Sequence, residues 1–438
     1  MHLKTIYLCK DCGYESGKWL GKCPTCNAWN SFVEDTEMVG PKSSLSKTPR
    51  SMKIAPKEAN PLKKSENTKS RILTNITEFD RVIGEGFIPG SMTLLSGEPG
   101  IGKSTLTLQI ANKVAKNHKV LLVSGEESIN QLSERNHRLG FDEKNLVAIN
   151  EFNLETILET TRKENPAFVI IDSIQVIASL DIPSQAGSIN QVRYCTESML
   201  ELAKTSNTTT LLIGHVTKDG TLAGPRVLEH LVDTVLSLEG DRYQQFRMLR
   251  ASKNRFGNCS EVGIFEMTEK GLSEVKNPSQ QFLEGRSLNA IGSIVTVAME
   301  GTRPFLVEVQ ALVSTTHFGY PKRTANGFDL NRLQILIAIL EKYGRLNLQN
   351  QDIFINIVGG MYLEEPAADL AILIAIASSY LKKPIPTNTV VFGEAGLSGE
   401  LRTVPHTEKR LKEAQKLGFQ NIISPEKFKK VFEAITSI

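Results

Sequence analysis

The sequence predicts a protein of the α/β class with a large central block, a small cysteine-bearing segment before it and an α+β domain after it. Three observations predict this. Four cysteines form two close pairs near the N-terminus, short apolar runs alternate with helical patterns across the centre, and strand-like runs precede helices in the last third. The expected divisions are residues 1–34, a linker over 35–70, a block over 71–276 and a last domain over 277–438.

Bulk composition sets broad limits. The chain has 438 residues and a formal net charge of +3, which by itself does not indicate a nucleic-acid partner. We find no apolar run long enough to cross a bilayer and no signal peptide, so we expect a cytoplasmic protein without membrane association. Six cysteines are few for this length, and in a reducing compartment two close pairs indicate metal binding rather than disulfides.

The first segment has the spacing C-x2-C-x10-C-x2-C, formed by Cys9, Cys12, Cys23 and Cys26. Two thiolate pairs supply the four soft ligands that tetrahedral Zn²⁺ takes in structural sites. Four thiolates leave no coordination position open for chemistry, so the pattern predicts a structural zinc finger whose folding depends on the metal. A redox dithiol pair and free thiols are the alternative interpretations. The linker that follows carries eight basic and two acidic residues between Pro41 and Ser70, which is typical of a flexible tether.

The central block contains a complete phosphate-binding loop, G-x-x-x-x-G-K-[ST]. A strand expected at Met92–Ser96 precedes it, and a helical pattern from Thr105 to Lys116 follows it, which is the context that the loop requires. Lys103 would contact the β- and γ-phosphates, and Ser104 would hold Mg²⁺. The expected nucleotide-binding residues are Gly97, Glu98, Pro99, Gly100, Ile101, Gly102, Lys103, Ser104 and Thr105.

Acidic residues at two further strand ends complete the predicted ATP hydrolase. Asp172 closes the apolar run Phe168–Ile171, and a carboxylate there can hold Mg²⁺ beside Ser104. Glu126 and Glu127 follow the strand Val120–Ser124, and we favour Glu126 as the base that orients the attacking water, with Glu127 left open. Other strands are expected at Ala167–Ile171, Thr210–Gly214 and Asp233–Leu238; His215, after the second of these, either senses the γ-phosphate or caps the strand.

The run Lys253-Asn254-Arg255-Phe256-Gly257 makes a resemblance specific. With the four cysteines, the phosphate loop and the runs 214–220 and 224–230, the chain resembles, over essentially its whole length, the bacterial DNA repair family called RadA or Sms. The resemblance implies a RecA-type ATPase core, a hexameric ring, ATP hydrolysis stimulated by single-stranded DNA, and branch migration of recombination intermediates. It also implies single-stranded and branched DNA, a recombinase and a replicative helicase as partners.

By the same resemblance, Lys253 and Arg255 take part in DNA-dependent work. They would contact either DNA phosphates or the ATP of a neighbouring subunit, and both alternatives stay open. Lys218 and Arg226 lie in a glycine-rich loop where RecA-type proteins bind DNA, so we expect them to contact DNA.

The last domain resembles that of Lon proteases, with strands expected at Ile294–Met299, Pro304–Val309 and Ile353–Val358 and helices at Asn331–Tyr343 and Ala367–Leu381. Lon enzymes use a Ser/Lys dyad. Here the serine position falls on Ala367 and the lysine position near Glu408 and Lys409. An alanine has no oxygen that a base could activate, so we do not expect a peptidase. Weaker candidates for DNA contact on this domain are Arg303, Lys322, Arg323 and Arg332.

One alternative from another class remains, a nucleotide-regulated scaffold with slow turnover that recruits partners. A clock-type kinase of the RecA fold would need a second nucleotide-binding domain or a phosphoacceptor tail, and the sequence has one phosphate loop. The acidic residues at the strand ends favour ATP hydrolysis with Mg²⁺, and we therefore prefer the DNA-dependent motor.

Overall fold

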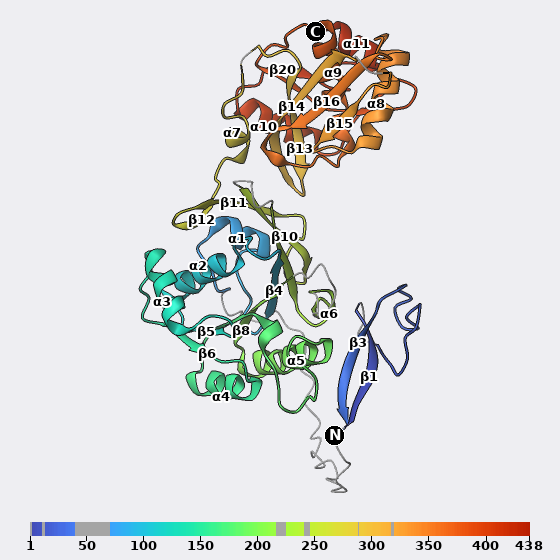
Figure 1. Ribbon diagram of the computed structural model, residues 1–438. Helices are drawn as coiled ribbons and strands as arrows, with labels where there is room; N and C mark the ends of the chain where they lie inside the picture. Colours follow the sequence, from blue (N-terminus) through green and yellow to red (C-terminus); the bar gives the residue numbers. More distant parts are fainter. Residues whose placement is uncertain are drawn as a thin grey trace, which may run out of the picture. The chain divides into compact units, whose positions relative to one another are not determined.

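The computed structural model describes residues 2–10, 14–39, 71–215, 225–240, 246–287, 289–316 and 319–438. The chain divides into two compact units, one over 1–259 and 263–274 and one over 260–262 and 275–438. Figure 1 shows the elements of each unit. Within the described ranges, no helix combines the length and the apolar character needed to cross a bilayer.

The N-terminal segment is an antiparallel ribbon rather than a cysteine turn alone. It comprises β1 (His2–Cys9), β2 (Glu15–Ser16) and β3 (Phe32–Val39), in the order β2-β1-β3. Strand β3 pairs with β1 from Phe32 opposite Cys9 to Val39 opposite His2. The strand therefore continues five residues past the expected end of the finger at residue 34.

The ATPase unit is built on a nine-stranded sheet in the order β12-β11-β10-β9-β4-β8-β7-β5-β6. Its six strands from β9 to β6 are parallel, and β10 is antiparallel to β9. The strands are β4 (Met92–Gly97), β5 (Val120–Ser124), β6 (Leu146–Asn150), β7 (Phe168–Asp172), β8 (Thr209–Ile213), β9 (Thr234–Glu239), β10 (Phe246–Asn254), β11 (Val262–Thr268) and β12 (Gly271–Glu274). This confirms the α/β class expected for the central block.

Helices cover both faces of this sheet because successive strand residues point to opposite sides. In β5, Val120 and Leu122 belong to one buried cluster, with side chains of α1, α2 and α3, while Leu121 and Val123 belong to the other, with α4 and α5. Figure 1 shows these two helix layers. The helices are α1 (Thr77–Ile83), α2 (Lys103–Ala115), α3 (Ile129–Arg138), α4 (Leu154–Glu164), α5 (Ile189–Ser206), α6 (Pro225–Leu228) and the 3₁₀ turn η1 (Ile174–Val176).

The second unit has a six-stranded mixed sheet in the order β15-β16-β14-β13-β17-β20, with a separate hairpin of β18 and β19. Helix α10 packs on the sheet face that carries Val295, Val297 and Leu306, and α9 packs along β13 and β14 with α8 and α11 against it. Strands are β13 (Ser293–Glu300), β14 (Arg303–Thr315), β15 (Arg323–Asn326), β16 (Gln351–Ile357), β17 (Thr389–Val391), β18 (Glu394–Ala395), β19 (Leu401–Arg402) and β20 (Asn421–Ile423). Helices are α7 (Pro278–Phe282), α8 (Leu330–Tyr343), η2 (Val358–Gly360), η3 (Pro366–Ala368), α9 (Asp369–Leu381), α10 (Thr407–Lys416) and α11 (Val431–Thr436).

Candidate functional site

The phosphate loop lies at the carboxyl end of β4 and leads directly into α2. Gly97 has a φ of 155°, and a Cβ there would lie 2.5 Å from the carbonyl oxygen of Leu238 on β9. Gly102, the N-cap of α2, has a φ of 114° and has no side chain that could accept a hydrogen bond from the first helical N–H groups. The first turn of α2 therefore presents backbone N–H groups at a site where the helix dipole favours an anion.

Lys103 is folded back onto the loop. Its ammonium donates hydrogen bonds to the carbonyl oxygens of Gly97, at 2.8 Å, and Glu98, at 3.0 Å, and the residue is 3 % exposed. Burial lowers the pKa of Lys103, and the charges of Asp172 and Glu126 oppose that shift. An ammonium held by two neutral carbonyls is available to a phosphate, which offers it a full negative charge.

Asp172 and Ser104 lie side by side. Burial raises the pKa of Asp172, a hydrogen bond from Ser104 lowers it, and the nearby charges of Glu126 and Glu127 raise it again. Two oxygen ligands of the type that Mg²⁺ takes are thus in contact, in a region where carboxylates outnumber ammonium groups. This arrangement fits the magnesium ion of a nucleotide complex.

Glu126 and Glu127 differ in what they contact. Glu126 accepts a hydrogen bond from Ser173 at 2.6 Å, and its Oε1 lies 3.5 Å from His215 Nε2. Glu127 is instead paired with Arg135 of α3. The charge of Glu126 also acts on Lys103 and Asp172, so the carboxylate lies near the phosphate loop. Among the described residues it forms no ion pair with an arginine or lysine.

Two residues beside this group were missed at the sequence level. Ser173 follows Asp172 directly and holds Glu126, so its position at the strand end was a usable signal. Gln175 donates to the carbonyl oxygen of His215 at 3.4 Å, while its buried Oε1 has no hydrogen-bond partner among the described residues. No sequence pattern marks Gln175, because its contact spans 40 residues.

The run 253–257 lies at the opposite end of the sheet from the phosphate loop. In the parallel pair of β4 and β9, Thr93 is opposite Thr234 and Gly97 is opposite Leu238, while Asn254 on β10 is opposite Thr234. By this register Asn254 is level with Thr93, four residues before Gly97, which at about 3.3 Å per residue is about 13 Å along the strand. The structure therefore does not bring Lys253 and Arg255 together with Lys103, Asp172 and Glu126.

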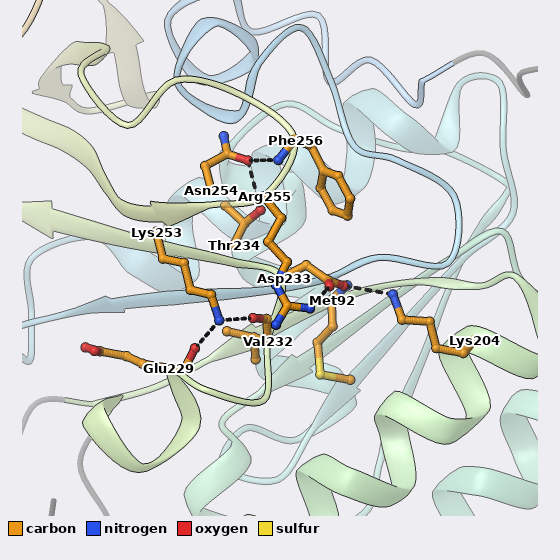
Figure 2. A network of polar contacts seen from close by, with 10 residues as sticks. All are labelled: Met92, Lys204, Glu229, Val232, Asp233, Thr234, Lys253, Asn254, Arg255 and Phe256. Carbon is orange, nitrogen blue, oxygen red and sulfur yellow. Dashed lines mark hydrogen bonds and ion pairs between the residues drawn. The ribbon is translucent and has the colours of Figure 1, made fainter. Parts of the chain in front are cut away.

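Figure 2 shows how this run is held. The ammonium of Lys253 donates to the carbonyl oxygens of Glu229, at 2.6 Å, and Val232, at 2.8 Å. Desolvation lowers the pKa of Lys253, and the charge of Arg255 lowers it further. Arg255 has a more exposed side chain, 55 %, and donates to Asp233 Oδ1 at 3.2 Å. Lys253 thus fixes the turn between α6 and β9, whereas Arg255 is directed to the surface.

The cysteines fit a tetrahedral metal site. The sulfur atoms of Cys9, Cys23 and Cys26 lie within 4.8 Å of one another, and those of Cys9 and Cys26 are 3.5 Å apart. Zn–S bonds of about 2.3 Å in a tetrahedron place sulfur atoms about 3.8 Å apart, so this spacing suits Zn²⁺. Cys12, the fourth predicted ligand, lies outside the described residues, as do Lys218 and the side chain of Arg226.

In the second unit Ala367, at which the resemblance to Lon proteases would place the serine, is buried, and 2 % of it is exposed. The residue of α10 that reaches this turn is Arg410, not Glu408 or Lys409, which are both exposed. Arg410 donates to both carboxylate oxygens of Glu365, at 2.9 and 2.5 Å. A cavity of about 430 Å³ lies beside this turn. Four acidic residues line it, Glu364, Glu365, Asp369 and Glu394.

Two of the weaker DNA-contact candidates are engaged within this unit. Arg332 forms a two-pronged pair with Asp369, whose side chain is 1 % exposed. Arg323 donates to the backbone carbonyls of Leu348 and Gln351. Both guanidinium groups therefore stabilise the domain, which makes them poor choices for a DNA contact.

Three known families match parts of the chain. The family described as Rubredoxin metal binding domain matches residues 7–34, that described as AAA domain matches residues 58–221, and that described as Subunit ChlI of Mg-chelatase matches residues 326–427. These matches agree with the expected order of a metal-binding segment, an ATPase core and a distinct C-terminal domain.

Similar proteins cover nearly the whole chain. A DNA repair protein RadA from Listeria monocytogenes is 50 % identical over 96 % of this chain and 92 % of its own length. Those from Bacillus subtilis and Halalkalibacterium halodurans are 48 % and 49 % identical, over 96 % and 97 % of this chain and 92 % and 93 % of theirs. Among solved structures, the KaiC-like protein PH0186 of Pyrococcus horikoshii is 24 % identical over 47 % of this chain and 99 % of its own, with a TM-score of 0.39.

Proposed function

Because the chain belongs to the RadA family of DNA repair proteins, we propose that it is a DNA-dependent ATPase that drives branch migration of recombination intermediates. Its substrates are ATP and branched or single-stranded DNA, and it works as a homo-hexamer with a recombinase and a replicative helicase as partners. The observation that carries the proposal is the group formed by Lys103, Ser104, Asp172 and Glu126, which has a residue for each step of ATP hydrolysis.

In this proposal, the loop amides and the first turn of α2 bind the phosphates. Lys103 leaves the carbonyls of Gly97 and Glu98 and contacts the β- and γ-phosphates, where it stabilises charge that develops during transfer. Ser104 and Asp172 would hold the Mg²⁺ ion, which neutralises phosphate charge when it is bound.

Glu126 orients the attacking water and accepts its proton. The hydrogen bond from Ser173 fixes the carboxylate, and His215 lies close enough to respond when that carboxylate moves. His215 directly precedes the run 216–224 in the sequence, and Lys218 in that run and Arg226 just after it are the residues that we expect to contact DNA. A change at the γ-phosphate can therefore reach that loop through a short chain of contacts.

Arg255 acts on phosphate outside its own nucleotide site, because the length of β4 separates it from its own loop. Lys253 acts indirectly by holding the turn at Glu229 and Val232, which follows the proposed DNA loop. The N-terminal segment binds Zn²⁺ through its four cysteines and serves as a docking module.

The test is extension of a partially exchanged three-strand DNA intermediate with labelled strands, in the presence of ATP and Mg²⁺. We expect wild-type protein to extend the exchanged region, Arg255→Ala to lose most of the rate, and Lys270→Ala, which removes an exposed cation elsewhere in the same unit, to match wild type. An intermediate that never advances while ATP is hydrolysed would refute branch migration, and would favour the scaffold alternative.

A further inference from the structure

One buried carboxylate joins the run 253–257 to the strand that leads into the phosphate loop. Asp233 lies just before β9, and its side chain is 4 % exposed. Its Oδ2 accepts hydrogen bonds from the backbone N–H of Met92 and the ammonium of Lys204, both at 3.0 Å, and its Oδ1 accepts from Arg255. Figure 2 shows Asp233 at the centre of these contacts.

The backbone of Asp233 reinforces the same connections. Its N–H donates to the carbonyl oxygen of Met92 at 2.9 Å, and its own carbonyl accepts from the N–H of Arg255 at 3.2 Å. Asp233 therefore contacts the first residue of β4 twice and Arg255 twice. Asp233 thus connects the start of β4 directly to Arg255, in addition to the pairing of β4 with β9 and of β9 with β10.

Arg255 is held loosely enough to take a second partner. Its guanidinium has five N–H donors in a rigid fork, and its contact with Asp233 is the one side-chain hydrogen bond that the described residues give it. The side chain is more than half exposed. Lys253 differs, because both of its short contacts are with backbone carbonyls of its own chain.

We propose that Asp233 is the positioning residue of Arg255: the buried carboxylate holds one edge of the guanidinium and leaves the other edge directed at a phosphate. The phosphate belongs either to the DNA backbone or to the nucleotide of a second copy of this chain. The inference rests on the proposed function of Arg255, and it adds a residue that nothing in the sequence motif marks.

The orientation, rather than the charge alone, is what Asp233 supplies. A planar guanidinium can bridge a carboxylate and a phosphate at the same time, whereas an ammonium is a point charge that cannot hold both in a fixed direction. The carboxylate would be costly to bury without compensation, and Met92 and Lys204 compensate one of its oxygens whether or not Arg255 is present.

The test is a double-mutant cycle on DNA-stimulated ATP turnover with Asp233→Asn and Arg255→Ala. Asparagine has the shape of aspartate and can still accept from Met92. We expect each single variant to lower DNA-stimulated turnover by roughly tenfold, because a misplaced or missing guanidinium at position 255 slows the reaction. In the Arg255→Ala background, we expect Asp233→Asn to lower stimulated turnover by less than about twofold. Lys204→Met, the control, removes the other cation from the same carboxylate and should stay within about twofold of wild type.

The outcomes separate the inference from the function on which it rests. Wild-type turnover in Arg255→Ala would overturn both. Arg255→Ala could lower turnover while Asp233→Asn, added to that variant, lowers it by roughly a further tenfold. This result would overturn the inference alone, because Asp233 would then act independently of Arg255. Melting temperatures of all variants identify any loss that comes from unfolding.

A second variant keeps the inference testable if Asp233→Asn fails to fold. Arg255→Lys changes an exposed side chain and keeps its charge, and we expect it to be as impaired as Arg255→Ala; wild-type turnover would overturn the inference. The salt dependence of single-stranded DNA binding then identifies the phosphate. If Arg255→Ala reduces the slope of log affinity against log salt concentration by about one, Arg255 contacts the DNA backbone. If the slope is unchanged and kcat is lower, Arg255 contacts the nucleotide of another copy of the chain.

Discussion

Arg410 and Glu365 form a largely buried ion pair in the second unit, at the turn where the resemblance to Lon proteases would place a serine. The side chain of Arg410 is 1 % exposed and that of Glu365 is 24 % exposed. Arg410 also donates to the carbonyl oxygens of Val297 and Pro405, and Glu365 accepts from the N–H of Met299 at 2.6 Å. Arg410 left alone would be a buried charge with incomplete compensation, and Glu365 left alone would be a partly buried one.

The burial values rank the two single variants. Breaking a buried pair costs about 3–5 kcal/mol, depending on what remains around the charge. Arg410→Met leaves Glu365 with the Met299 N–H and partial access to water, so we expect a loss of about 3 kcal/mol. Glu365→Gln leaves a fully buried guanidinium without a counter-charge, so we expect about 4 kcal/mol. The double variant leaves no unpaired charge, so we expect about 2 kcal/mol rather than the sum.

The assay is hydrogen exchange of backbone amides in α10 and β13 of the full-length protein, read by mass spectrometry. Tryptophan fluorescence would not report on this unit, because Trp19 and Trp29 both lie in the N-terminal segment. Lys409→Met, on the exposed side of the same helix, is the control and should change stability by less than about 0.5 kcal/mol. Additive effects in the double variant would show that the two charges do not stabilise each other, and a larger loss in Arg410→Met than in Glu365→Gln would show that burial does not set the cost.

Three further predictions follow from the ATPase unit and the N-terminal segment. Burial holds the pKa of Asp172 above its usual value, so ionisation of Asp172 opposes folding, and stability is lost as pH rises from about 4 through the raised pKa. At pH 7 without metal, Asp172→Asn should therefore melt about 2–4 °C above wild type, and it should lose hydrolysis; a lower melting temperature would contradict this. Cys26→Ser should lower the zinc content measured by mass spectrometry and unfold the N-terminal segment, while the ATPase unit still melts cooperatively. Lys253→Met should speed hydrogen exchange over residues 225–232 because two carbonyls lose their donor, whereas equal exchange would show that the contacts are dispensable.

Much of the ATPase fold was predictable because apolar runs mark its buried parallel strands. Val120–Ser124 was predicted with its observed bounds, and the strands at β7, β8 and β9 shift by one residue. The small shifts arise because ladder hydrogen bonds, rather than apolar character, decide where a strand ends. Strand β3 was not predicted, and the segment was expected to end at residue 34, since Glu34, Asp35 and Glu37 leave no continuous apolar run there.

The helix expected at Ala367 shows a similar limit. The chain forms a 3₁₀ turn over Pro366–Ala368, and α9 begins only at Asp369. The proline favours a helical first turn, but its sequence signal does not separate a 3₁₀ turn from an α-helix. Boundaries were therefore predicted less well than the elements themselves.

The candidate site was predictable where one local pattern carries the chemistry, as in the phosphate loop. Contacts between distant segments were not. Asp233 binds the N–H of Met92 across 141 residues, and Arg410 binds Glu365 across 45. No periodicity or motif reports such partners, since tertiary packing alone brings them together. The same limit hid the distance between Arg255 and its own phosphate loop, which only the strand register reveals.

The central claim is that this chain couples ATP hydrolysis to DNA. The most direct measurement is steady-state ATP hydrolysis by the purified protein with and without single-stranded DNA, with Lys103→Ala as the inactive variant and Lys116→Ala, an exposed lysine at the other end of α2, as the matched control. We expect clear stimulation by DNA, a loss of at least about 100-fold in Lys103→Ala and wild-type behaviour in Lys116→Ala. Slow hydrolysis that does not respond to DNA would contradict it.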